Sequence, residues 1–171
     1  MGMFDDIAKD VVNQKVTVRN GRAAERCEVE AVVTGITRTK TLKQGPLTAI
    51  DMVVVGSSGP EGVTGNRAGE VISKTYPTLQ PWAIANLKKD LCLFSKVPFE
   101  TLSDAEFKQI DELASKGAFT GLAVKLTPRS YIGKDGEEKH VHDFRLVPGK
   151  NDPKDIAKRA KTLSDGGEVT F

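Results

Sequence analysis

The order of β-rich and helical segments constrains the fold of this chain more than any other feature of its sequence. Residues rich in Val, Ile and Thr fill 25–42, 47–55 and 70–76, a composition typical of strands. The same pattern returns at 119–127 and 138–147 after a stretch with helical spacing. Strands and helices do not alternate one by one, so the parallel sheet of a βαβ protein is not expected. The sequence therefore predicts a mainly β domain of the α+β class with a helical insert.

Turn residues join the strands of each group into hairpins. Gly and Pro at 43–46 separate the first two strands, and a Gly-Lys-Asp-Gly turn at 133–136 separates the last two. A glycine-rich connection at 56–69 leads into the third strand. The chain is therefore expected to form a long hairpin with a third strand, followed after the helices by a second hairpin.

Two helices are expected between the third and fourth strands. Pro81 suits the first turn of a helix, and apolar residues follow near helical spacing as far as Phe94. Ser103 and Glu106 form a capping box for a second helix, which Gly117 can end. Three strands, a helical insert and two strands is the order of the oligonucleotide/oligosaccharide-binding (OB) fold, a five-stranded, partly open barrel. We therefore expect an OB-type barrel.

Short helices are also expected at both ends of the chain. Phe4, Ile7 and Val11 have helical spacing, and Asp152 can cap a charged helix over 153–163. The last eight residues, 164–171, contain two glycines and two acids, which suits a mobile tail that does not contribute to the domain. The predicted organisation lists three parts: an N-terminal helix and lead-in at 1–22, the OB domain at 23–148, and a charged helix with a flexible tail at 149–171.

Composition limits the class of protein and its compartment. The hydrophobic fraction is 39% and the charged fraction 28%, values that allow an ordinary globular core. No apolar run approaches the roughly 18 residues of a membrane span, and none resembles a signal peptide. The only cysteines, Cys27 and Cys92, are expected to be buried thiols. A soluble protein of the reducing cytoplasm is therefore expected.

Several segments resemble bacteriophage single-stranded-DNA-binding proteins with OB folds. They are the Gly-Glu-Val-Ile entry to the third strand at 69–72, the Ala-Asn-Leu-Lys-Lys segment at 85–89, and the turn at 133–136 with its closing strand and Pro148. The likeness covers about residues 25–148 as a pattern. It implies a protein without cofactor that coats exposed single strands during phage replication or recombination, in the host cytoplasm and with little sequence preference.

The positive charge is concentrated where such a protein would bind. The net charge is only +2, but residues 31–75 carry five Lys/Arg against three Asp/Glu, and 121–161 carry ten against six. In an OB fold the loops at 39–47 and 132–139 would flank the binding face, where cations follow phosphates and aromatic rings stack on bases. The candidate nucleic-acid-binding residues are Arg38, Lys40, Lys43, Arg67, Lys74, Tyr76, Arg129, Tyr131, Lys134, Lys139 and Arg145. The alternative for any one of them is an ordinary solvated strand residue.

The C-terminus resembles the acidic, hydrophobic-ended tips with which such proteins recruit replication and repair partners. Asp165, Glu168 and Phe171 carry this likeness, which implies that they bind a partner protein or compete with DNA for the basic face. The sequence leaves open the oligomeric state, including a homo-oligomer, and the preference for DNA or RNA.

Other chemistry has weaker support in the sequence. Trp82 has helical spacing with its apolar neighbours, which favours a core position over a stacking platform, and Phe94, Phe107 and Phe119 are also expected in the core. His140 and His142 lie two apart on one strand face, so a metal site or a metal-assisted nuclease is an alternative. No nucleotide-binding, hydrolase or metalloprotease motif occurs, and an enzyme is not expected. The rival to DNA binding is a β-barrel structural or assembly protein that docks protein partners.

Overall fold

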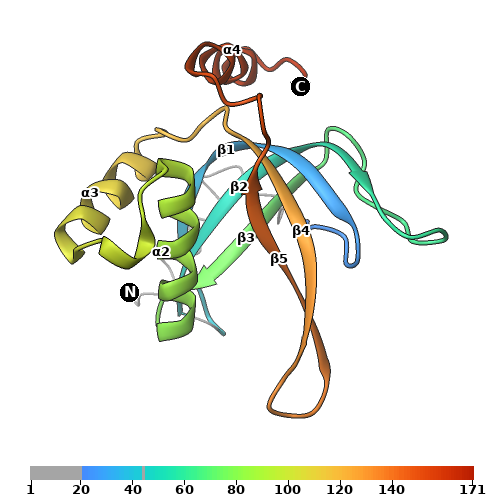
Figure 1. The fold of residues 1–171 in the computed structure, drawn as a ribbon, viewed down its shortest axis with the longest axis vertical. Helices are drawn as coiled ribbons and strands as arrows, with labels where there is room; N and C mark the ends of the chain where they lie inside the picture. The colour runs from blue at the N-terminus through green and yellow to red at the C-terminus, as the bar shows by residue number, and fades with distance from the viewer. Residues whose placement is uncertain (1–20, 44) are drawn as a thin grey trace, which may run out of the picture.

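The computed structural model describes residues 21–43 and 45–171. Five strands form one antiparallel sheet in the order β3-β2-β1-β4-β5 (Figure 1). The strands are β1 (Glu28–Thr41), β2 (Gly45–Ser58), β3 (Val71–Pro77), β4 (Ala123–Ile132) and β5 (Glu138–Leu146). The predicted five strands and their hairpins are confirmed.

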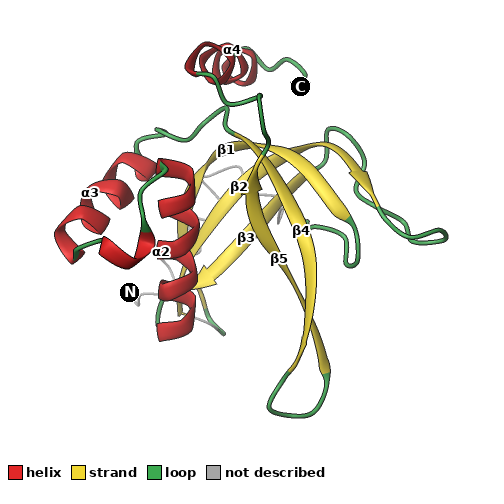
Figure 2. Ribbon diagram, viewed as in Figure 1, coloured by secondary structure: helices red, strands yellow, loops and turns green. Residues whose placement is uncertain are grey.

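The helices lie beside one face of the sheet and beyond one end of it (Figure 2). Those between β3 and β4 are α2 (Pro81–Ser95), the 3₁₀ turn Phe99–Thr101 and α3 (Asp104–Ser115), and α4 (Pro153–Ser164) follows β5. The α+β class, the helical insert and the C-terminal helix are therefore confirmed. The expected N-terminal helix lies outside the described residues. Within the described part of the chain, no helix is both long enough and apolar enough to cross a membrane.

Strand β1 is bent and pairs with a different strand on each side, β2 and β4. It pairs with β2 along its whole length, but with β4 only from Val29 to Val32. Its pairing with β2 shifts register between Glu30 and Ala31 and again between Val33 and Gly35. Extra residues of this kind bend a strand and increase its twist. The rest of β1, from Val33 to Thr41, pairs with β2 but not with β4, and it leads to the turn of the β1–β2 hairpin.

The sheet is open, so the expectation of a barrel is wrong as regards closure. With this strand order, a barrel would close by pairing β3 with β5, and the described residues contain no such pairing. One reason is that the free edge of β3 is partly occupied: Gly21 donates to the Val71 carbonyl at 3.0 Å and accepts from the Ser73 amide at 3.0 Å. The other is that α2 packs against both β3 and β5.

Side chains bridge the opening that the backbone leaves. Lys74 on β3 lies 3.0 Å from a carboxylate oxygen of Asp90 on α2, and its ammonium lies 5.0 Å from the ring centroid of Phe144 on β5. Tyr76 on β3 also donates a hydrogen bond to Asp90. The Asp90 carboxylate on α2 therefore binds two side chains of β3, Lys74 and Tyr76. Lys74 also contacts the Phe144 ring on β5.

The core lies between the inner face of the sheet and the two inserted helices. Ala83, Leu87, Leu91 and Phe94 recur every three or four residues along α2 and are buried. The Phe94 ring packs edge to face on Phe119 and Phe144, with centroids 5.6 and 5.1 Å apart. Phe107 and Phe119 are partly buried against the same cluster, and Cys27 and Cys92 are free buried thiols, as expected.

The C-terminal helix is fixed to the domain by a buried arginine. Arg159 donates from Nε to the Gly121 carbonyl at 2.7 Å and from Nη2 to the Lys150 carbonyl at 2.6 Å. The Phe171 ring centroid lies 6.0 Å from the Arg159 guanidinium carbon. This contact places Phe171 against α4, within the C-terminal part 149–171, because a guanidinium attracts the face of an aromatic ring. That the last eight residues do not contribute to the barrel stays a prediction. Partner recruitment through Asp165, Glu168 and Phe171 would require Phe171 to leave this position.

Candidate nucleic-acid interface

The β4–β5 hairpin projects well beyond the rest of the sheet (Figure 1). Paired residues of antiparallel strands share a face, and the pairs Arg129–Val141 and Tyr131–Lys139 place both β4 residues on the outer face of the hairpin. The Tyr131 side chain is 46% exposed, and the guanidinium carbon of Arg129 lies 6.0 Å from its ring centroid. The predicted shared face of Arg129 and Tyr131 is therefore present, with an accessible ring between cations.

Two carboxylates partly neutralise these cations. Arg129 donates from Nε to Asp143 at 2.8 Å, and Lys139 lies 3.0 Å from a carboxylate oxygen of Asp135. The hydrogen bond from Arg129 is the main reason why the pKa of Asp143 is lowered. The backbone amide of Glu137 and then Lys139 lower the pKa of Asp135. Both carboxylates are therefore ionised at neutral pH, and the two cations are held in place beside Tyr131.

Other cations of the hairpin are exposed and have no ion pair within the described part of the chain. Lys134 lies in the turn that joins β4 to β5, and Arg145 lies on β5 opposite Lys125. Lys125 itself contacts Glu28 and Glu30 of β1. The available positive charge therefore lies at the tip of the hairpin and on the outer face of β5.

The loop between β1 and β2 contributes a second pair of cations. Lys40 and Lys43 are exposed and form no ion pair with any described residue. Arg38 instead points to the helical side, where it contacts Asp111 and lies 3.1 Å from Ser115, both on α3. Lys40 and Lys43 are therefore both available at this loop, whereas Arg38 is paired with α3.

Lys74 and Tyr76, two other predicted contacts, face the core rather than solvent. Tyr76 is only 1% exposed, so its ring offers no surface on which a base could stack. Burial, followed by the charge of Asp90, raises the pKa of Tyr76 well above its ordinary value. Thr48 and Ile50 on β2 pair with these residues and are buried with them on the inner face. Tyr76 therefore has a structural role. The Lys74 side chain is 24% exposed and paired with Asp90, and its role in binding stays a prediction.

Arg67 lies apart from the other predicted residues. It is exposed in the connection between β2 and β3, at the opposite end of β2 from the β1–β2 loop (Figure 1). The adjacent Asn66 amide binds the Arg22 carbonyl at 3.1 Å and Glu70 at 3.0 Å, which orders this connection.

Trp82 is 59% exposed, contrary to the expectation that it lies in the core. The inward stripe of α2 begins one residue later, at Ala83, and continues through Leu87 and Leu91. Successive helical residues point about 100° apart, so Trp82 faces away from the core. Spacing counted from Ala83 would have revealed this in the sequence.

The two histidines do not form a metal site with other ligands. The Nε2 atom of His142 lies 3.1 Å from the Cys27 carbonyl oxygen, and burial lowers the pKa of this imidazole. Among residues 21–43 and 45–171, no three His, Cys, Asp or Glu side chains are grouped to hold an ion. A neutral His142 hydrogen-bonded to a backbone carbonyl is consistent with a role in packing.

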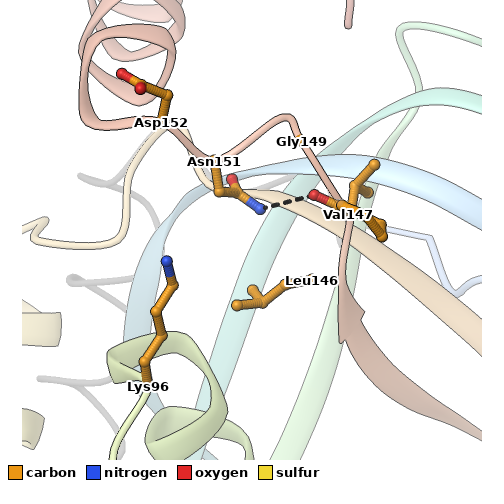
Figure 3. Close-up of a pocket in the computed structure, with 7 residues that line it drawn as sticks. Lys96, Leu146, Val147, Gly149, Asn151 and Asp152 are labelled. Carbon is orange, nitrogen blue, oxygen red and sulfur yellow. Dashed lines mark hydrogen bonds between the residues drawn. The ribbon is translucent and has the colours of Figure 1, made fainter.

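A shallow pocket lies between the end of α2 and the β5–α4 connection (Figure 3). Asn151 dominates one wall: its amide group binds the Ala123 backbone through two hydrogen bonds of 2.8 Å. Asp152 caps α4 by accepting from the Lys154 amide at 2.9 Å. Lys96 lies on the opposite wall (Figure 3). The polar groups near Asn151 therefore serve the local chain, and we place the candidate interface at the hairpins instead.

Neither the models of known protein families nor the curated proteins contain a match to this chain. Its function is therefore inferred from the geometry and charge of the two hairpins.

Proposed function

We propose that this chain is a single-stranded-DNA-binding protein that coats exposed strands during phage replication or recombination, with little sequence preference and without a cofactor. The observation that carries the proposal is the exposed Tyr131 ring, held between Arg129 and Lys139 on a projecting hairpin. An accessible ring flanked by cations suits a base and its neighbouring phosphates, whatever the base is.

The arrangement of the sheet supports the same proposal. An OB fold presents its ligand-binding surface with the loops between strands one and two and between strands four and five on its flanks. Here those loops carry Lys40, Lys43 and Lys134, all exposed. We interpret the domain as an open variant of the OB barrel, in which α2 occupies the position where β3 and β5 would otherwise pair.

The direct test is a titration of a fluorescent oligo-dT, with duplex DNA and single-stranded RNA of equal length as comparisons. We expect the protein to bind the single strand more tightly than the duplex, and affinity should fall steeply with salt because bound phosphates release counterions. If the oligonucleotide does not bind even at low salt, the proposal is wrong. The comparison with single-stranded RNA decides whether the protein binds DNA only or both nucleic acids.

A paired lysine variant localises the charge contact. Replacing Lys40 and Lys43 by alanine should lower the slope of log affinity against log salt by about 1.4, since each single-strand phosphate contact contributes about 0.7. Lys154 and Lys158 are exposed on α4, at the opposite end of the molecule (Figure 1), so their double alanine variant is a control with the same change in charge. Equal slopes for both variants would place the binding site elsewhere.

The rival function, docking of a protein partner, has one observation in its favour. Ile132 is 69% exposed on the inner face of the same hairpin. Base stacking does not need an exposed aliphatic side chain there, whereas a protein partner could cover it. A docking module would bind no oligonucleotide at any salt concentration. The oligo-dT titration therefore separates the two functions.

A further inference from the structure

The first turn of α2 and the β1–β2 loop form an exposed apolar surface next to unpaired cations. Leu42, Leu79 and Trp82 are 78%, 68% and 59% exposed. The Thr78 amide donates to the Pro46 carbonyl at 3.0 Å, so the residues that precede α2 lie against the start of β2. We call Lys40, Leu42, Lys43, Leu79 and Trp82 the loop–helix patch.

Leu79 lies against the start of β2, at a residue whose backbone conformation favours glycine. A Cβ atom built on Gly45 would lie 2.8 Å from a Leu79 methyl carbon, and the φ of Gly45 is +69°. Thr41 pairs with Gly45, which places the loop residues Leu42 and Lys43 directly beside this contact. The loop and the start of α2 therefore form one continuous surface rather than two separate ones.

The charge around the patch suits a polyanion. Residues 31–50 and 71–89 contain six Lys or Arg and no Asp or Glu. Three of these cations are paired with acids on α2 and α3, namely Arg38 with Asp111, Lys74 with Asp90 and Lys88 with Asp104. Lys40, Lys43 and Lys89 form no ion pair within the described residues. A surface that combines an exposed ring with three unpaired cations suits the bases and phosphates of a single strand.

An exposed stripe on α2 continues from the patch along the helix. Trp82, Ala85, Asn86 and Lys89 follow helical spacing and are all exposed. Helix α2 also packs against β5, so the stripe lies on an element that borders the β4–β5 hairpin. The start of α2, the β1–β2 loop and the hairpin all lie at the end of the molecule away from α4 (Figure 1).

We propose that Trp82 in the loop–helix patch stacks on a base of a bound strand that also contacts the β4–β5 hairpin. This inference rests on the proposed function. It adds a second aromatic contact besides Tyr131, and phosphate contacts at Lys40, Lys43 and Lys89. Because the core contacts of α2 begin at Ala83, Trp82 is free to serve this role without cost to packing.

Trp82 is the only tryptophan in the chain, so its emission reports this contact alone. Unlabelled oligo-dT should quench the emission, and the quenching should saturate together with the anisotropy of a labelled strand. Trp82→Ala should weaken binding by about 5- to 150-fold, the equivalent of one stacked base, and Trp82→Phe should recover part of the loss. Phe99→Ala is the control, because Phe99 is an aromatic residue of similar kind that is 42% exposed outside the patch.

The two proposals fail in different ways. If the labelled strand binds but tryptophan emission is unchanged and Trp82→Ala binds as tightly as the parent protein, the base contact at Trp82 is refuted and DNA binding stands. That result is also what a protein-docking patch would give. If the labelled strand does not bind at low salt, DNA binding itself is refuted, and the role of Trp82 with it. The emission measurement uses the unaltered protein, so it does not depend on whether a variant folds.

Discussion

Replacing Tyr76 by phenylalanine removes one hydroxyl from the buried contact that holds α2 against β3. Tyr76 donates to Asp90, which is itself only 7% exposed and also binds Lys74. A hydrogen bond to a charged group contributes about 1.5–3 kcal/mol to stability. For a protein of this size, each kcal/mol changes the melting temperature by about 2–4 °C. The variant should therefore melt about 3–12 °C lower than the parent protein.

The other tyrosine of the chain supplies a matched control. Tyr131 is 46% exposed and its hydroxyl forms no hydrogen bond with a described residue, so Tyr131→Phe should leave the melting temperature unchanged. Binding should show the reverse order: Tyr131→Ala should weaken oligo-dT binding by about 1–3 kcal/mol, while Tyr76→Phe binds normally. Thermal unfolding by circular dichroism and anisotropy titrations measure the two properties. If Tyr76→Phe weakens binding without lowering the melting temperature, the assignment of Tyr76 to the core is wrong.

Alkaline titration of the Tyr131→Phe protein adds a second readout, because Tyr76 is then the only tyrosine. Burial raises the pKa of Tyr76 above its ordinary value of 10.0, so the folded state favours the neutral phenol. This contribution to stability is fully present below the ordinary pKa and is lost as the pH rises above it. Phenolate absorbance should therefore appear only well above that value and together with unfolding. Ionisation at the ordinary value in a folded protein would refute the buried contact.

Three further predictions concern packing and pH. Arg159→Met should lower the melting temperature by several degrees, because it leaves the Gly121 and Lys150 carbonyls without their donor; an unchanged melting curve would contradict this anchor. Deleting Phe171 should lower it by about 1–4 °C, through loss of a contact with a cation worth about 0.5–1 kcal/mol. His142→Gln should reduce the loss of stability as the pH falls below 6.5, since burial lowers the pKa of His142 and the unfolded state takes up the proton first; equal pH profiles for both proteins would exclude this role.

The element order was predictable because local chemistry specifies it. The Ser103–Glu106 capping box is present at the start of α3, Pro81 is at the start of α2, and Asp152 caps α4. These signals depend only on residues near each other in the chain, so they can be recognised without knowledge of the fold. The hairpin turn residues are local in the same sense.

Which side chains point into the core could not be predicted, because this depends on residues of other helices and strands. Arg38 and Tyr76 belong to strands whose alternation the sequence shows, but their acidic partners Asp111 and Asp90 lie on other elements, the helices α3 and α2. The register shifts in β1 also change which residues face inward, and no local turn residue marks them apart from Gly35. Tyr76 is therefore buried, whereas Tyr131 and Trp82 are exposed.

The open sheet leaves one place on the perimeter of this domain without backbone hydrogen bonds between strands. A barrel closed by backbone hydrogen bonds has a circumference fixed by its strands, whereas here the gap between β3 and β5 is spanned by Lys74, Asp90 and Phe144. Widening the gap would break no backbone hydrogen bond between these two strands, but it would disturb the ion pair of Lys74, the Tyr76–Asp90 hydrogen bond and the packing of Phe94 on Phe144. The width of the domain at this place therefore depends on side-chain packing around α2.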